Sequence, residues 1–182
     1  GRVYAYWGGC ASPCYIVELE DDMVTFKEET LVSNPLGHST CPWNSEDDGH
    51  ISLIDGFFEA SSPRKVMGKY VYSKRYEKPV PELGVYEPNN GFLSYRFSDS
   101  PFGPFHDGGD ISFNGGEILK DADGCGTMTY QWGNNHGSIV EIKGKWYVFY
   151  HRQTGVNEFS RQAMLEPIDV AMGRDGKLYI GD

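Results

Sequence analysis

An all-β fold of short antiparallel strands is predicted by three features of this sequence. Aromatic residues make up 14% of the chain, as 12 Tyr, 10 Phe and 4 Trp, and aromatic residues are enriched in strands. The 23 Gly and 10 Pro residues supply many turns. Short apolar runs flanked by Gly, Pro or acidic residues recur along the chain, and no long amphipathic helical pattern is found between them.

The expected strands begin with residues 3–7 and 15–19, where Tyr, Val and Ile predominate. The further strands are expected at 57–60, 65–67, 69–73, 93–97, 138–142, 145–150, 163–168 and 177–180. Two irregular stretches, 33–50 and 115–135, are too long for tight hairpins. Loops of this length are often functional, and residues 33–50 and 115–131 are candidate walls of a binding site.

A pattern of strand, Gly-Lys turn and aromatic strand occurs around Gly68-Lys69 and again around Gly144-Lys145. The chain opens on a similar segment at Gly1-Arg2, and Gly176-Lys177 echoes it. A four-stranded unit that recurs in this way suggests the blades of a β-propeller, although such hairpins also recur in other antiparallel proteins. The chain holds roughly two and a half units, whereas a closed propeller needs about four blades or more. Either the spacing misleads, or the chain is part of a longer chain or assembly.

The charge of the chain and its short apolar runs argue against two classes of partner. Its 26 acidic and 16 basic residues give a formal net charge of −10, and the basic runs are as short as Lys74-Arg75. A phosphate-binding surface needs basic clusters, so nucleic acid is not an expected partner. No segment approaches the roughly 20 apolar residues of a membrane span, so no membrane partner is expected. An acidic, aromatic-rich chain suits a neutral ligand such as a sugar.

One carboxylate stands out because of its neighbours. Glu59 follows Phe57-Phe58 in an expected strand. If that strand is buried, its apolar surroundings would raise the pKa of the carboxyl group, as a glycosidase general acid requires. The alternative reading is a glutamate at the sheet rim that pairs with Arg64 or Lys65.

Two further residues are candidates for a site. His136 lies among small residues before an expected strand, where it could bind a metal, hydrogen-bond a sugar or cap the strand. No second ligand stands beside it at the spacing of a metal site. Arg161 could hold a hydroxyl or carboxylate of a ligand, or it could pair with Glu158 or Glu166 at the surface.

Four segments of the chain, taken together and in order, resemble glycoside hydrolase family 43. They are 57–65 with its Glu-Ala-Ser-Ser core, 98–105, 134–152 and 159–168. The resemblance implies an all-β, five-bladed β-propeller with antiparallel four-stranded blades. Residues 1–182 would be a single incomplete catalytic domain that holds roughly the last three blades and lacks the N-terminal ones.

The resemblance also implies an activity and a set of roles. The family hydrolyses glycosidic bonds with inversion, here of arabinose- or xylose-containing plant polysaccharides or oligosaccharides such as xylan. Glu59 maps onto the general acid. His136 maps onto a residue that ligates a central calcium or other cation, directly or through water, and no organic cofactor is implied. The expected substrate-binding residues are Arg161, His151, Trp43 and Trp132, the two tryptophans lying in or beside the long irregular stretches.

The chain departs from the family pattern at its start. The family's general base is an Asp of the first blade, and a second Asp in an Asp-Pro motif tunes the pKa of the acid; neither is present. Asp55 precedes Glu59 by four residues but matches neither motif. Inversion requires a base about 6.5–9.5 Å across the sugar from the acid. The chain alone is therefore expected to be inactive, with the missing N-terminal blades as its partner.

Two other functions remain open. The aromatic content would also suit a carbohydrate-binding β domain without catalysis. A structural β domain, whose strand edges are completed by a partner, is the third reading. Arabinose and xylose, and exo and endo action, are equally compatible with the sequence.

Overall fold

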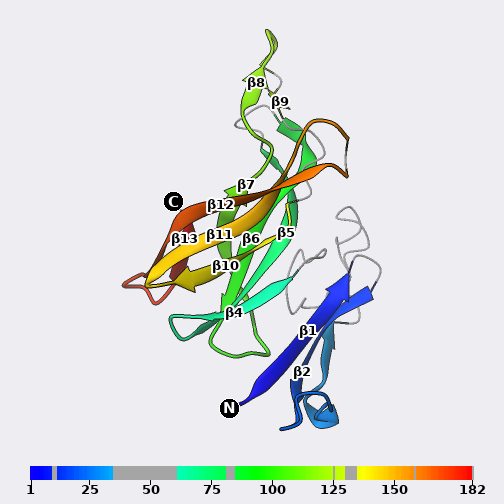
Figure 1. Cartoon of the computed structure of the whole chain (residues 1–182), viewed down its shortest axis with the longest axis vertical. Helices are drawn as coiled ribbons and strands as arrows, with labels where there is room; N and C mark the ends of the chain where they lie inside the picture. The colour runs from blue at the N-terminus through cyan, green and yellow to red at the C-terminus, as the bar shows by residue number, and fades with distance from the viewer. Residues whose placement is uncertain are drawn as a thin grey trace. The chain divides into compact units, whose positions relative to one another are not determined.

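The structure is a computed structural model, and it describes residues 1–9, 12–34, 61–80, 85–124, 126–129, 135–157 and 159–181 (Figure 1). The strands are β1 (Val3–Gly9), β2 (Ser12–Leu19), β3 (Val32–Asn34), β4 (Ser62–Val66), β5 (Lys69–Val80), β6 (Val85–Ser98), β7 (His106–Phe113), β8 (Ile118–Lys120), β9 (Gly126–Met128), β10 (Gly137–Ile142), β11 (Lys145–Gln153), β12 (Arg161–Met172) and β13 (Leu178–Gly181). The only helix in these residues is the 3-10 turn η1 (Glu28–Thr30). None of the described helices is long and apolar enough to cross a membrane.

The strands form sheets in sequence order. Two sheets have four strands, β4-β5-β6-β7 and β10-β11-β12-β13, and a third sheet has the order β1-β2-β3. The pairs β1–β2, β2–β3, β10–β11, β11–β12 and β12–β13 are antiparallel. The predicted all-β fold with antiparallel four-stranded units is confirmed.

The Gly-Lys pattern in the sequence corresponds to two-residue hairpin turns. In the turn between β4 and β5, Met67 and Gly68 have φ angles of 47° and 86°. In the turn between β10 and β11, Lys143 and Gly144 have φ angles of 52° and 77°. Two consecutive positive φ angles define a type I′ turn, whose twist matches that of the flanking strands, and glycine adopts such angles without steric cost. The repeat therefore marks equivalent hairpins.

Two expected loops are partly strands. Residues 33–34 belong to β3, and the stretch 115–135 contains the hairpin β8–β9, with Leu119 paired to Thr127. Its strands are three residues long and lie among Gly and Asp residues, so they carry no apolar alternation from which a strand could be predicted.

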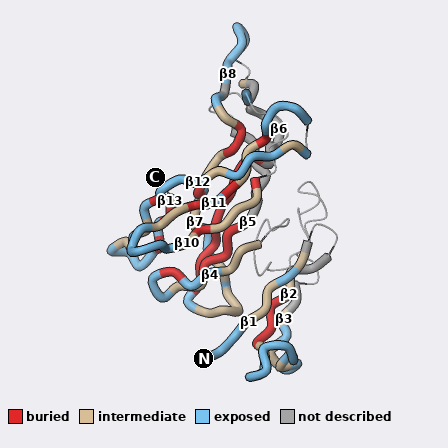
Figure 2. The backbone as a smooth tube through the Cα atoms, in the orientation of Figure 1, coloured by how far each residue is buried: buried red, intermediate tan, exposed pale blue. Residues whose placement is uncertain are grey.

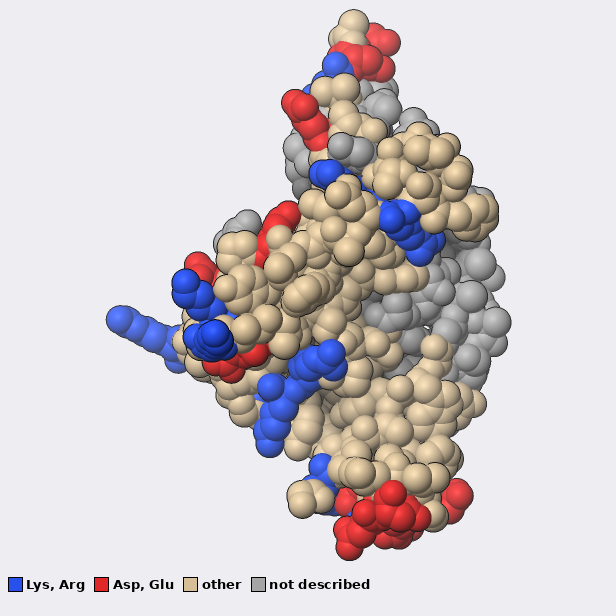
Figure 3. Space-filling model, viewed as in Figure 1, with Lys and Arg blue, Asp and Glu red and all other residues tan. Residues whose placement is uncertain are grey.

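The described chain divides into two compact units, each considered by itself. Unit 1 comprises Gly1–Tyr72 and Arg96–Asp107, and unit 2 comprises Ser73–Tyr95 and Gly108–Asp182. Buried residues follow individual strands (Figure 2). On the face drawn in Figure 3, Lys and Arg side chains stand in separate small groups among neutral residues.

A buried tyrosine joins β6 to β13 in the core of unit 2. Tyr95 on β6 is 1% exposed, and its hydroxyl donates to the carbonyl oxygen of Leu178 at 2.8 Å and accepts from the amide of Ile180 at 3.1 Å. Gly108 lies against the ring, where a Cβ atom would come within 2.1 Å of it. A buried hydroxyl that satisfies two backbone groups holds β13 to this core.

Unit 1 contains a carboxylate shared by two cations. Glu18 on β2 has only 2% of its side chain exposed. Arg2 Nε donates to its Oε2 at 2.9 Å, and Lys27 Nζ donates to its Oε1 at 2.7 Å. The hydrogen bonds from Arg2, and then those from Lys27, lower the pKa of Glu18 to about 2 against the opposing effect of burial.

This lowered pKa predicts a particular acid sensitivity. The stability that ionised Glu18 contributes is complete above the pKa of an unfolded glutamate, about 4.3, and is lost as the pH falls from there through about 2. We expect Glu18→Gln to lower the unfolding midpoint at neutral pH and to flatten its decline in acid. Thermal unfolding followed between pH 7 and acid measures both effects. The exposed control Glu29→Gln should keep the parental slope, and an unchanged slope in Glu18→Gln would contradict the assignment.

Candidate functional site

A pocket of about 370 Å³ lies in unit 2 over the strands β10, β11 and β12. It brings together three residues that the sequence analysis predicted as site residues, His136, His151 and Arg161. The other side chains and backbone at its wall are Gly137, Ser138, Phe149, Tyr150, Gln162 and Ala163. The antiparallel register explains the gathering, because Gly137 is paired with Tyr150 and His151 with Ala163.

The residue before His136 anchors that end of the pocket. Asn135 is fully buried, and its Nδ2 donates to the carbonyl oxygen of Gly91 at 3.1 Å and to Ser112 Oγ at 3.2 Å. These acceptors lie on β6 and β7, so the backbone just ahead of His136 is tied to two strands of another sheet. A buried amide held in this way limits the positions open to its neighbour.

The residue after His136 is a glycine for a steric reason. A Cβ atom on Gly137 would lie 2.3 Å from the carbonyl oxygen of Phe149, 2.8 Å from Leu93 Cδ2 and 3.1 Å from Tyr150 Cα. Two of these atoms are backbone and cannot rotate away. Glycine lets β10 approach β11 at the point where β10 begins, and this approach places His136 at the pocket wall.

The two histidines of the pocket are neighbours. Their ring centroids are 5.2 Å apart and the rings stand at 81°, an edge-to-face arrangement. Asn114 Nδ2 donates a hydrogen bond to the carbonyl oxygen of His151 at 2.8 Å, and this bond helps to fix the His151 backbone. Each neutral imidazole carries one donor and one acceptor nitrogen, and His151 Nε2 is buried.

Arg161 begins β12 and has an exposed side chain. No ion pair joins it to a carboxylate within the described part of the chain, and Glu158 lies outside that part. Because successive side chains of a strand point to opposite faces, Arg161 and Glu166, five residues apart, face opposite sides of β12. The predicted alternative, a surface pair with Glu166, is therefore wrong.

Glu166 instead accepts a hydrogen bond from the Tyr150 hydroxyl at 2.5 Å. Burial, reinforced by this carboxylate, raises the pKa of Tyr150 to about 12. The phenol therefore stays protonated at neutral pH and remains a hydrogen-bond donor. Tyr150 lines the pocket but was not among the predicted site residues, and its hydroxyl is held by Glu166, on the side of β12 opposite to Arg161.

The described residues of this pocket do not form a calcium site by themselves. No group of three or more His, Cys, Asp or Glu side chains in the described ranges could hold a metal ion. Calcium takes about six to eight oxygen ligands, whereas His136 and His151 offer nitrogen. The cation expected near His136 stays a prediction.

Three predicted site residues lie outside the described residues. They are Glu59, the expected general acid, and the expected sugar-site tryptophans Trp43 and Trp132. The description of the chain resumes at residue 61, and the strand β4 begins three residues after Glu59.

Comparison with known proteins finds curated relatives, although no family model matches the chain. The chain is 34% identical over 177 residues to a xylosidase/arabinosidase of Thermoclostridium stercorarium, covering 93% of the chain and 33% of that protein. It is 33% identical to a xylosidase/arabinosidase of Bacteroides ovatus, covering 78% of the chain and 34% of that protein. The chain thus spans about a third of the length of these curated relatives.

Solved structures resemble the chain along its whole length. An α-L-arabinofuranosidase from Clostridium thermocellum matches with a TM-score of 0.58 at 22% identity, covering 100% of this chain and 49% of that one. A glycoside hydrolase family 43 arabinoxylan arabinofuranohydrolase from Bacillus subtilis, in complex with cellotetraose, matches with a TM-score of 0.61 at 24% identity, covering 98% and 34%. At these identities the likeness establishes the fold: the four-stranded sheets are blades of a five-bladed β-propeller, and the predicted fold class is confirmed.

Proposed function

This chain belongs to glycoside hydrolase family 43, and from that premise we propose that it is the later part of an enzyme that cleaves glycosidic bonds of arabinose- or xylose-containing plant saccharides with inversion. The observation that carries the proposal is the pocket of unit 2. Three predicted site residues, His136 just before β10, His151 on β11 and Arg161 on β12, line one pocket. The register of β10, β11 and β12 brings these positions together, and the polar side chains that they place at one pocket support a common ligand.

In this proposal the pocket residues bind and orient the sugar. The guanidinium of Arg161 donates to hydroxyl oxygens at one side, and the imidazoles of His136 and His151 donate or accept at the other. The exposed ring of Phe149, at 43% exposure, offers an apolar surface to a sugar face. Held in this way, the sugar would be bound in one orientation rather than tumbling.

Glu59 is proposed as the general acid that protonates the leaving oxygen. A water on the opposite side of the sugar attacks the anomeric carbon, and a carboxylate base takes its proton. That base and the Asp that tunes the pKa of Glu59 are proposed to lie in blades that precede Gly1. Residues 1–182 would then be one portion of a single propeller domain.

The sheet β1-β2-β3 supports the idea of preceding blades. By the repeat, β1 occupies the place of β5 and β11, and each of those strands is paired on both edges, β5 with β4 and β6, β11 with β10 and β12. Among the described strands β1 is paired with β2 alone. We propose that the other edge of β1 pairs with a strand of a preceding blade.

The test compares two proteins on the same substrates. We expect this chain alone to give no turnover of nitrophenyl arabinofuranoside or nitrophenyl xyloside, and the protein extended to include the upstream coding sequence to hydrolyse at least one of them. NMR of the released sugar should show the inverted anomer as the first product.

Other outcomes would overturn parts of the proposal. Turnover by this chain alone would remove the need for upstream blades. Saturable oligosaccharide binding by the extended protein, without hydrolysis of any arabinoside or xyloside, would favour the non-catalytic carbohydrate-binding domain. A retained anomer as first product would exclude the inverting mechanism.

A further inference from the structure

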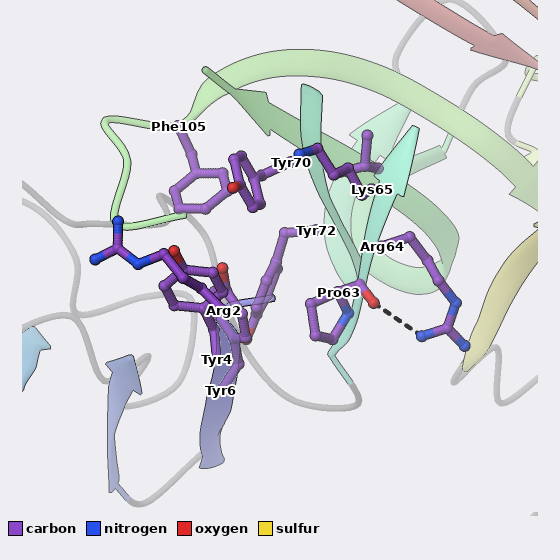
Figure 4. A pocket seen from close by; sticks show the side chains of 10 residues that line it. Arg2, Tyr4, Tyr6, Pro63, Arg64, Lys65, Tyr70, Tyr72 and Phe105 are labelled. Atoms are coloured by element: carbon purple, nitrogen blue, oxygen red, sulfur yellow. Dashed lines mark hydrogen bonds between the residues drawn. The ribbon is translucent and has the colours of Figure 1, made fainter. Parts of the chain in front are cut away.

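A second pocket, of about 480 Å³, lies in unit 1, and the function proposed above does not use it (Figure 4). Its volume is within the range of about 300–1,000 Å³ typical of small-molecule sites. Aromatic rings from three segments form its wall: Tyr4 and Tyr6 of β1, Tyr70 and Tyr72 of β5, and Phe105 before β7. Tyr4 and Tyr70 meet edge to face with centroids 6.1 Å apart, and Tyr6 and Tyr72 are 5.8 Å apart. These ring contacts hold the side chains of the pocket wall in place.

The charge at this pocket is opposite to that of the protein. Arg2, Arg64 and Lys65 line it, and no Asp or Glu is among its described lining residues, although the whole chain carries −10. Lys65 Nζ lies 5.2 Å from the centroid of the Tyr70 ring, and the Arg2 guanidinium lies 5.9 Å from that of Tyr4. In Figure 4 these two cations stand on opposite sides of the group of rings, while Arg64 turns aside to the carbonyl oxygen of Pro63.

The ion pair of Arg2 does not cancel this charge. Its partner Glu18 is also paired with Lys27, so one carboxylate serves two cations and the group of three keeps a net positive charge. Lys65 is exposed, and the Arg2 side chain is 68% exposed, so both reach solvent and a ligand. Cations held over aromatic rings at a pocket rim are suited to a ligand with a carboxylate on one side and a ring beside it.

We propose that this pocket is a binding site for a hexuronic acid residue of a plant polysaccharide. The pyranose ring would lie in the pocket beside Tyr4, Tyr6 and Tyr70, and its carboxylate would be held by Lys65, with Arg2 adding positive charge on the other side of the rings. Neutral pentoses lack the carboxylate and would bind weakly. Since the site is confined to unit 1, the proposal does not depend on Glu59 or on any catalytic step.

The test is a calorimetric titration of the chain with three oligosaccharides: xylotriose, xylotriose that carries a glucuronic acid branch, and trigalacturonic acid. We expect at least one uronic acid ligand to bind about tenfold or more tightly than xylotriose, and its affinity to fall as sodium chloride is raised. Lys65→Met keeps the apolar stem and removes the charge, so it should abolish the preference without unfolding the chain. Lys65→Arg should restore it.

The control is Lys145→Met, which removes an exposed lysine from β11 in unit 2 and should leave all affinities unchanged. Tight binding of the glucuronic acid ligand alone would identify a xylan branch as the source, and tight binding of trigalacturonic acid alone would identify a pectic chain. Equal affinity for the neutral and the uronic ligands, or an equal loss in the two lysine variants, would overturn the proposal.

Discussion

Replacement of Glu59 by Gln in the upstream-extended protein is expected to lower kcat by a factor of about 10²–10⁴ on a natural saccharide such as xylobiose or an arabino-oligosaccharide. Positioned proton transfer contributes a factor of this size, and an amide cannot donate the proton that the leaving oxygen needs. The KM should change little, because the substitution keeps the shape of the side chain. Steady-state rates on the saccharide measure the effect.

The leaving group provides the internal control. Nitrophenolate departs without protonation, so Glu59→Gln should cost far less on nitrophenyl glycosides than on the natural saccharide. The pH profile of kcat should also lose its alkaline limb, which reports the general acid. The exposed Glu29 of η1 is the matched control, and Glu29→Gln should leave both rates unchanged. Full activity of Glu59→Gln, or an equal loss on both kinds of substrate, would contradict the assignment of the acid.

Substitution of Gly137 by Ala is expected to destabilise the protein by about 1–3 kcal/mol, the usual cost of forcing an extra carbon into a packed site. The added Cβ would come within 2.3 Å of the Phe149 carbonyl oxygen, so β10 must move away from β11. That movement would also displace His136, and binding of xylose-containing ligands should weaken along with stability. Denaturant unfolding measures the first effect and titration with xylotriose the second.

The same substitution at Gly1 is the control for this effect. A Cβ atom there has no neighbour within 4 Å, so Gly1→Ala should unfold at the parental denaturant concentration. If Gly137→Ala were as stable as the parent to within about 0.5 kcal/mol, the close approach of β10 and β11 at His136 would be incorrect.

Several parts of the fold could be predicted because they depend on local chemistry. The Gly68 and Gly144 turns are examples, since glycine adopts the positive φ angle that the second residue of such a turn needs, whatever the rest of the chain does. The β8–β9 hairpin could not be predicted in this way. Its strands are only three residues long, and their pairing rather than their composition makes them strands.

For the candidate site, too, the residue types could be predicted from the sequence, whereas their contacts could not. His136, His151 and Arg161 were recognisable as residue types in suggestive motifs, but the motifs say nothing of distance. The hydrogen bond between Tyr150 and Glu166 could not be predicted from the sequence. Its partners are sixteen positions apart, and only the pairing register of β11 with β12 brings them together. The same register decided which partner Glu166 has.

By itself the sequence determined the all-β class, the hairpin turns and the resemblance to family 43, since strand alternation, turn chemistry and short motifs are properties of neighbouring residues. The tertiary structure alone decided which side chains share a cavity. In unit 2 it brings His136, His151 and Arg161 to one pocket. In unit 1 it places arginine and lysine side chains beside a group of tyrosines in another pocket. The physical reason is that strand register and sheet packing set distances between residues remote in sequence, and the chemistry of a site depends on those distances.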